Sequence, residues 1–244
     1  MISFHQDKKY LKRGFSLIEM SIVLVIIGLI IGGIITGKSL IANSELKTVI
    51  SDVSSFKTKS LSFLDKYDYL PGDIPNAWVV FGSVLNIADR EPHLCISSAH
   101  CNGDGDSLVT YYGGTHSSLP ETQKYWDHLH AADMWNGGEM NNLGKSSYSG
   151  SCHRPIYGRF LGRTGHMLSL GRGTYCTSAV LTNQQAYTID KKMDDGHGAR
   201  GNVRARTTGA IDCVTTGNYG SPTNNTYILE NGGVACSMRF FWLD

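Results

Sequence analysis

An uninterrupted apolar run near the N-terminus is the strongest feature of the sequence. Residues 15–35 read FSLIEMSIVLVIIGLIIGGII and carry one charged side chain, that of Glu19. As a helix rising about 1.5 Å per residue, this run spans roughly 30 Å, the thickness of the hydrocarbon core of a bilayer. Between residues 46 and 64, apolar positions recur at spacings of three and four, the period of an amphipathic helix. The pattern predicts one long helix, with an apolar half at 15–36 and an amphipathic half at 37–66.

Basic residues before the apolar run indicate its orientation. Lys8, Lys9, Lys12 and Arg13 precede it, and positive residues hold that flank of a membrane helix in the cytoplasm. A secretory signal peptide has a shorter apolar region and ends in a small-residue cleavage site, and this run has neither property. We therefore expect a single-pass segment with a cytoplasmic N-terminus and most of the chain outside.

Turn and capping signals divide the remainder, residues 67–244, into short elements. Prolines and a glycine at 70–76 end the long helix, because proline cannot continue one. Two further helices are predicted at 119–136 and 183–193. Each begins at a capping box, in which a hydroxyl residue is followed three residues later by Glu or Gln, and the pairs are Ser118 with Glu121 and Thr182 with Gln185.

Short strand-like stretches separated by Gly, Asn and Ser clusters favour an antiparallel sheet over a parallel one. They lie at 107–112, 156–161, 167–170, 203–207, 227–230 and 234–242. The predicted fold class is α+β, in which a head at 67–244 with an antiparallel sheet packs on the amphipathic half of the long helix.

Charge is unevenly distributed and argues against a nucleic-acid binder that relies on a basic field. The 244 residues have a formal net charge of +1. Residues 1–14 carry +3 and the remainder −2, so the basic excess lies in the short segment before the apolar run. A nucleic-acid partner stays an alternative only if the protein serves DNA uptake.

Six cysteines in a chain expected outside the cytoplasm indicate disulfides. None forms a CxxC motif, so structural zinc is disfavoured. Six cysteines allow 15 pairings. Nearby partners lose least entropy on loop closure, which favours Cys95 with Cys101, Cys152 with Cys176, and Cys213 with Cys236.

Glu19 is the residue that a plain membrane anchor does not explain. A carboxylate inside a membrane helix costs about 3 kcal/mol near the centre and less near an end, and the helix supplies no cation for it. The motif KRG-FSLIE around it closely resembles the processing signal of type IV prepilins, with a basic leader, glycine, phenylalanine and glutamate at the fifth mature position. Three stretches of the head also resemble prepilin-type proteins: YLPGDIPNAW, YWDHLHAADMWNGG and AYTIDKKMDDGHGARGNVRA.

The resemblance implies processing and assembly. A leader at 1–14 would be cleaved after Gly14 by a prepilin peptidase, which would also N-methylate Phe15. Glu19 would then pair with the amine of Phe15 on a neighbouring subunit. The chain would enter the bacterial inner membrane and leave it, through inner-membrane assembly machinery, for a periplasmic or cell-surface filament of pilin subunits. A pseudopilin of a type II secretion or DNA-uptake system and a non-polymerising membrane-anchored adhesin remain alternatives.

Two acidic groups raise the question of calcium. Asn102, Asp104 and Asp106 alternate as at the start of a calcium loop, but the sixth position is Ser107 and the twelfth is Gly113, where such a loop needs Gly and Glu. A polar turn is therefore the favoured interpretation. A second acidic group lies at the end of the helix predicted at 183–193 and consists of Asp190, Asp194 and Asp195. An ordinary helix end is favoured there, so no cofactor is required and calcium is the alternative at both groups.

No sequence motif predicts an enzyme. GxSxG, HExxH and phosphate-binding-loop patterns are absent from the sequence, and we expect no catalytic residue. His128 and His130 diverge on a helix because positions i and i+2 do not face each other. We expect both to be surface histidines.

Overall fold

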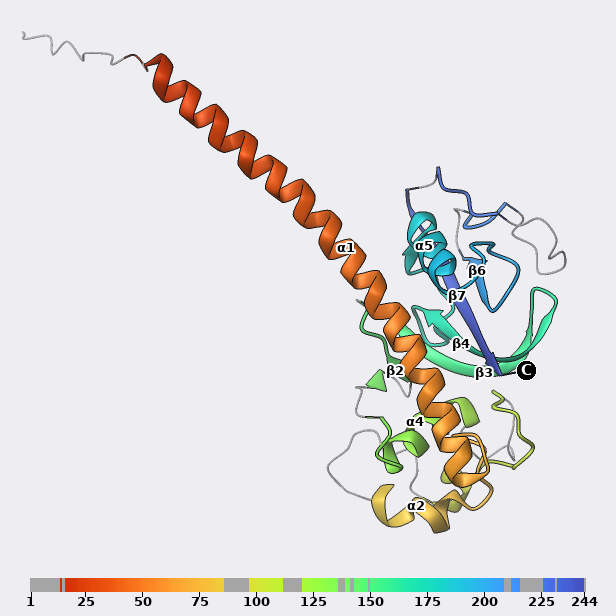
Figure 1. Cartoon of the computed structure of the whole chain (residues 1–244). Coiled ribbons are helices and arrows are strands. Elements are labelled where there is room, and N and C mark those ends of the chain that lie inside the picture. Colours follow the sequence, from red (N-terminus) through yellow and green to blue (C-terminus); the bar gives the residue numbers. More distant parts are fainter. Residues whose placement is uncertain are drawn as a thin grey trace, which may run out of the picture. The chain divides into compact units, whose positions relative to one another are not determined.

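The computed structural model describes residues 14, 16–85, 97–111, 120–135, 139–140, 143–148, 150–208, 212–215, 226–230 and 232–243. The backbone forms two units, Met1–Ser44 and Glu45–Asp244. Helix α1, Leu17–Tyr67, runs through the boundary between them without a break (Figure 1). We call Glu45–Asp244 the globular unit and describe each unit separately.

The first unit contains the apolar half of α1, as the hydropathy pattern predicts. Its large side chains are exposed, with Leu17 91% and Leu29 73% accessible. By length and composition this helix is apolar enough to cross a membrane, with a mean hydropathy of 2.7 over an 18-residue stretch. Thr36 is exposed, and its hydroxyl donates back to the carbonyl of Gly32 at 3.0 Å, so this polar group is satisfied within the helix.

A seven-stranded antiparallel sheet forms the centre of the globular unit. Its order is β1-β2-β3-β4-β7-β5, and β6 also pairs with β7. Figure 1 shows the long β3–β4 hairpin beside β7. The strands are β1 (Glu139–Met140), β2 (Leu143–Lys145), β3 (Cys152–Phe160), β4 (Arg163–Gly171), β5 (Leu181–Thr182), β6 (Val203–Thr207) and β7 (Val234–Leu243).

Strand β7 is buried on both faces and organises the core. Met238, Phe240 and Trp242 alternate along it and join the main hydrophobic core, while Phe241 belongs to a second cluster on the opposite face with Met167. Successive side chains of a strand point to opposite faces, so β7 contributes to both clusters, although Ser237 and Arg239 interrupt its apolar sequence.

The amphipathic half of α1 packs into the main core. Val49, Phe56 and Phe63 are at most 2% exposed, and the ring of Phe56 lies 5.5 Å from that of Tyr125 and 5.6 Å from that of Trp242. On its flank, Asp52 accepts hydrogen bonds from the backbone N–H of Ser147 at 2.8 Å and from its hydroxyl at 2.9 Å. The helix face is thus fixed by aromatic packing and by one polar clasp.

The described part of the unit also contains four shorter helices: α2 (Ala77–Leu85), α3 (Ser98–Cys101), α4 (Glu121–Ala131) and α5 (Asn183–Met193). Helix α5 and strand β6 have the bounds that the sequence predicts, and both bonds of the Thr182–Gln185 capping box form. Helix α5 packs against β6 and β7. The predicted α+β class, a long apolar helix followed by an antiparallel sheet, is confirmed.

Several element predictions are wrong. Residues 107–111 form no strand, and Tyr227 makes an isolated bridge to Val214 instead of a strand at 227–230. Helix α4 is shorter than the predicted 119–136 because the backbone reverses at Asp133, where φ is 59°. Helix α2 was missed because its sequence, AWVVFGSVL, has no polar face to mark a helical period.

Candidate functional site

The first site is the beginning of α1, where the sequence predicts processing and assembly. Gly14 and Ser16 are described, and Phe15 lies outside the described residues. The backbone N–H of Ser16 donates to Oε2 of Glu19 at 2.7 Å. A carboxylate in the first turn of a helix is favoured by the unpaired N–H groups and the positive end of the helix dipole. The start of the helix therefore stabilises the Glu19 carboxylate in the full-length chain, although Glu19 forms no ion pair among the described residues.

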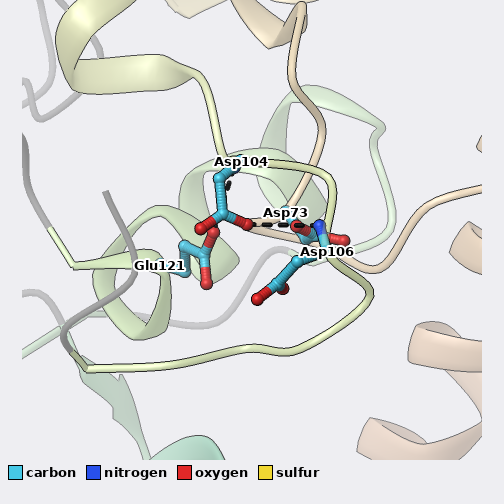
Figure 2. Close-up of side chains that lie close together, drawn as sticks. All are labelled: Asp73, Asp104, Asp106 and Glu121. Carbon is cyan, nitrogen blue, oxygen red and sulfur yellow. Dashed lines mark hydrogen bonds between the residues drawn. The ribbon is translucent and has the colours of Figure 1, made fainter. Parts of the chain in front are cut away.

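The second site is a cluster of four carboxylates, which we call the acidic cluster: Asp73, Asp104, Asp106 and Glu121. Figure 2 shows them converging from three separate segments: the turn after α1, the loop 102–107 and the start of α4. One oxygen of each lies within 4.8 Å of one oxygen of every other. Asp104 and Asp106 come from the predicted acidic loop. Asn102 does not join them, because its Oδ1 accepts from the backbone N–H of Trp78 at 2.8 Å.

Backbone amides hold the two buried carboxylates in place. Asp73 accepts from the N–H groups of Gly105 at 2.8 Å and Ser107 at 3.0 Å. Glu121 accepts from the N–H groups of Asp104 at 3.2 Å and Thr110 at 3.0 Å. The predicted role of Glu121 in a capping box is wrong, because its carboxylate faces this loop; Ser118 lies outside the described residues.

Two glycines make the close approach of these segments feasible. Gly72 has φ of 89°, and a Cβ there would overlap the carbonyl of Glu121. A Cβ on Gly103 would overlap the backbone of Asp73. Gly72 is required by both its positive φ and the contact, and Gly103 by the contact alone, so these two positions let the loop lie directly on the turn that carries Asp73.

Burial controls the electrostatics of the acidic cluster. It raises the pKa of Asp73 to about 6 and that of Glu121 to about 7, and the amide hydrogen bonds only partly oppose this. Lys124, on α4, is 1% exposed and donates through Nζ to the carbonyl of Asn102. Burial lowers the pKa of Lys124, while the carboxylates of Glu121 and Asp104 oppose that change. The cluster thus has more acidic groups than the nearby ammonium can neutralise, the condition that a bound cation would relieve.

His128 connects the same region and corrects the expectation of a surface histidine. It is fully buried. Its Nδ1 accepts from the N–H of Gly72 at 2.8 Å, and Nε2 lies 2.9 Å from the carbonyl of Cys101. Burial lowers its pKa to about 4, so the neutral ring cross-links the turn after α1 to α3. His130, two residues further along α4, is half-buried.

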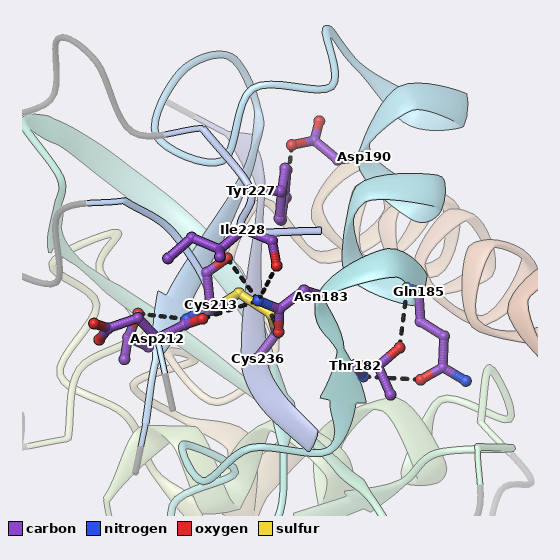
Figure 3. The surroundings of a disulfide bond; sticks show 10 residues. Thr182, Asn183, Gln185, Asp190, Asp212, Cys213, Tyr227, Ile228 and Cys236 are labelled. Atoms are coloured by element: carbon purple, nitrogen blue, oxygen red, sulfur yellow. Dashed lines mark hydrogen bonds between the residues drawn. A yellow bond between two sulfur atoms is a disulfide. The ribbon is translucent and has the colours of Figure 1, made fainter. Parts of the chain in front are cut away.

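The second predicted acidic group, Asp190, Asp194 and Asp195, also converges, but each carboxylate has a structural role. Asp190 accepts from the hydroxyl of Tyr227 at 2.8 Å (Figure 3) and from the N–H of Gly196 at 3.2 Å. Asp194 accepts from the N–H groups of Asn202 and Val203. These bonds fix the end of α5 against β6, which agrees with the interpretation as a helix end. Burial raises the pKa of Asp190 to about 7.

Two disulfides join the favoured pairs, Cys152 with Cys176 and Cys213 with Cys236. Cys101 is also disulfide-bonded, and Cys95 lies outside the described residues. The side-chain amide of Asn183 supports the second bridge by donating to three backbone carbonyls, those of Asp212, Cys213 and Ile228 (Figure 3). This bridge ties β7 to the segment that follows β6.

The sequence pattern placed neither Asp73 nor Glu121 in the acidic cluster. The Pro-Gly-Asp turn was used as a helix stop, and no local spacing connects residues 73, 104–106 and 121. The available signal for this contact is the pair Gly72 and Gly103, each followed by an aspartate, since glycine permits close approach of two backbone segments.

The described residues comprise one long helix, whose first half is apolar enough to cross a membrane, and a globular unit of the α+β class. Residues 10–35 match the family described as the prokaryotic N-terminal methylation motif. These residues carry the type IV pilin signature. No curated protein and no solved structure matched the chain. The match covers Gly14, Phe15 and Glu19 but none of the globular unit.

Calcium at the acidic cluster stays a prediction. Millimolar Ca²⁺ is expected to raise the melting temperature of the chain, because a ligand that binds only the folded state at ten times its Kd adds about 1.4 kcal/mol, and sites of extracellular modules bind at about 10⁻⁴–10⁻³ M. Asp106→Asn should abolish the rise, whereas Asp65→Asn, an exposed change on α1, should preserve it. Equal melting curves with Ca²⁺ and with chelator, read by circular dichroism, would contradict the prediction.

The raised pKa of Asp190 predicts a pH dependence of stability. The folded state retains a proton on this group between about pH 4 and 7 that the unfolded state has lost, so its stabilising contribution disappears as the pH rises through 7. Asp190→Asn should remove this dependence. When the pH is raised from 5 to 8, the free energy of unfolding of the variant should therefore increase relative to that of the wild type by on the order of 2 kcal/mol. Denaturant unfolding at both pH values measures this gain. Asp65→Asn is the control, and parallel curves for wild type and Asp190→Asn would refute the assignment.

Proposed function

We propose that this protein is a structural subunit of a type IV pilus or pilus-like filament. It is cleaved after Gly14, N-methylated at Phe15, and polymerises through the apolar half of α1. The observation that carries the proposal is the methylation motif at residues 10–35, with Glu19 in the first turn of an uninterrupted helix. Its role is structural and not enzymatic.

Glu19 supports assembly over simple anchoring. Its hydrogen bond to the N–H of Ser16 stabilises the carboxylate at a helix start, but it provides no positive charge. Cleavage creates an amine four residues before Glu19. In a bundle of apolar helices, that amine on a neighbouring subunit attracts the carboxylate more strongly than it would in water.

The two halves of α1 support the same function. The large side chains of the apolar half are exposed, as suits a surface that passes from lipid to the apolar surfaces of neighbouring helices. The amphipathic half is integrated into the core of the globular unit through Val49, Phe56 and Phe63. A subunit of this kind uses one helix both as the assembly element and as the core of its head. Its contacts would be heterologous and open, as a filament requires.

The partners and the location follow from this proposal. A prepilin peptidase processes the chain, other pilin subunits pack around α1, and inner-membrane machinery extracts it from the bilayer. The chain is first a single-pass inner-membrane protein with a cytoplasmic N-terminus and then part of a periplasmic or surface filament. The disulfides Cys152–Cys176 and Cys213–Cys236 suit a head in an oxidising compartment.

Gly14→Asp is expected to block processing, because the peptidase would meet a charged, branched side chain at the cleaved bond. Full-length precursor should accumulate in the membrane fraction, with a mature fraction lowered at least tenfold. N-terminal sequencing or intact mass spectrometry measures this. Gly28→Ala, a change within the apolar helix where a Cβ would meet nothing within 4 Å, is the control. A methylated Phe15 terminus in the Gly14→Asp strain would disprove the processing site.

Glu19→Ala is expected to leave cleavage intact but to reduce incorporation into filaments by about tenfold, because the subunit loses the attraction to its neighbour's amine. The measurement is mass spectrometry of sheared surface filaments, with electron microscopy for their presence. Glu45→Ala, which removes an exposed carboxylate from the same helix, is the matched control. Normal incorporation of the Glu19 variant would contradict the assembly role of Glu19, whereas absence of the wild-type chain from the filaments would favour a non-polymerising anchored protein.

A further inference from the structure

Two hydrogen bonds between side chains and backbone fix the start of α1. The carbonyl of Ser16 accepts the first helical bond, from the N–H of Met20 at 3.2 Å, so Ser16 is the N-cap residue. Its hydroxyl accepts from the N–H of Ile18 at 3.3 Å, and its own N–H donates to Oε2 of Glu19 at 2.7 Å. Serine is among the residues best suited to this position, and a Glu three residues later completes the cap.

Both bonds occupy N–H groups that would otherwise extend the helix towards the N-terminus. In an α-helix each N–H donates to the carbonyl four residues earlier. A longer helix would therefore pair the N–H of Ile18 with the carbonyl of Gly14, and the N–H of Ser16 with the carbonyl of Lys12. The hydroxyl of Ser16 takes the first of these donors, and the carboxylate of Glu19 takes the second. The helix begins only after Ser16 for this reason.

Gly14 is left outside the helix and accessible. It is exposed, has no regular secondary structure, and a Cβ built on it would meet nothing within 4 Å. Among the described residues, no backbone N–H donates to its carbonyl. The methylation motif at residues 10–35 independently covers this position. A nucleophile must reach the carbonyl of a peptide bond in order to cleave it, and a helical hydrogen bond from Ile18 would cover the oxygen of this carbonyl.

We propose that Ser16 is a positioning residue for processing: its hydroxyl holds the N–H of Ile18 and so keeps the carbonyl of Gly14 free for the prepilin peptidase. The inference rests on the proposed function, because it takes the bond between Gly14 and Phe15 as the one that is cleaved. In that hydrolysis water adds to the carbonyl carbon of Gly14 and the C–N bond breaks, which leaves a carboxylate on Gly14 and an amine on Phe15. Ser16 takes no part in the hydrolysis and acts only on the conformation of the substrate.

The two bonds of the cap differ in their effect on cleavage. The bond to Glu19 holds the N–H of Ser16, whose helical partner would be a carbonyl two residues before the cleaved bond. The bond from Ile18 holds the one N–H that would pair with the cleaved carbonyl itself. Processing therefore depends on the hydroxyl of Ser16 more than on the carboxylate of Glu19.

Cleavage of the full-length chain by a purified prepilin peptidase in detergent micelles tests the proposal. Mass spectrometry of the released leader gives initial rates over a range of chain concentrations and so separates kcat from KM. Ser16→Thr and Ser16→Val form a matched pair, because the two side chains have nearly the same shape and only threonine carries a hydroxyl. Ser16→Thr should keep kcat/KM within about twofold of the wild type, and Ser16→Val should lower it about fivefold, the usual effect of losing an N-cap.

The loss in Ser16→Val should be an increase of KM at nearly constant kcat, because the cap sets the fraction of chains whose Gly14 carbonyl is free. Ser21→Val is the control. It removes another exposed hydroxyl from α1, one that donates to the carbonyl of Ile18 at 2.8 Å and holds no N–H, and it should leave kcat/KM unchanged.

A double variant separates this role from direct recognition of the hydroxyl by the peptidase. Proline has no N–H and is tolerated in the first turn of a helix, so in Ile18→Pro nothing at that position can donate to the carbonyl of Gly14. Ser16→Val combined with Ile18→Pro should therefore be cleaved as fast as Ile18→Pro alone. A peptidase that contacts the hydroxyl directly would instead cleave the double variant more slowly.

Carbon-13 chemical shifts of Gly14 in the same micelles report its conformation without the peptidase. They should move towards helical values in Ser16→Val and stay at the wild-type values in Ser16→Thr. The proposal is overturned if Ser16→Val is cleaved as fast as the wild type, or if the double variant is slower than Ile18→Pro alone. If the wild-type chain itself is not cleaved after Gly14, the proposed function fails and this inference fails with it.

Discussion

The packing of one face of α1 against the sheet and α4 is the interaction on which the globular unit depends. Phe56 contacts an aromatic residue from each, Tyr125 on α4 and Trp242 on β7. Burying a large aromatic side chain contributes about 3 kcal/mol. The helix would expose an apolar face to water if the sheet were absent, and the sheet would lack the cover of one face. The helix that carries the pilin signature is therefore also a core element of the head.

The sequence predicted the features that depend on neighbouring residues along the chain. Helix α5 and its Thr182–Gln185 capping box, strand β6 and the course of α1 all follow from local period and local hydrogen bonding. Strand β3 extends to Cys152, through His153, Arg154 and Pro155, because pairing along the whole length of β4 overrides weak strand propensity. No single-segment pattern contains that information.

Prediction from neighbouring residues alone was equally incomplete for the acidic cluster. Asp104 and Asp106 were identified from their spacing, but Asp73 and Glu121 arrive from segments far apart in the sequence. His128 was expected at the surface because positions 128 and 130 do not face each other on a helix, whereas the turn after α1 and α3 cover the side of α4 that carries His128. Tertiary contacts decide which polar residues are buried. The helical spacing of residues in the sequence does not show which other elements will cover a polar side chain.

The clasp between Asp52 and Ser147 has a mechanical consequence. Together with the buried side chains of Val49, Phe56 and Phe63, it attaches α1 to the rest of the globular unit at points spread along several helical turns. A pull along the helix axis loads all these points at once, in shear, so none yields before the others. A sideways pull at the N-terminal end of this stretch loads them one after another, as in peeling. A head built in this way resists tension along its own helix far better than tension across it.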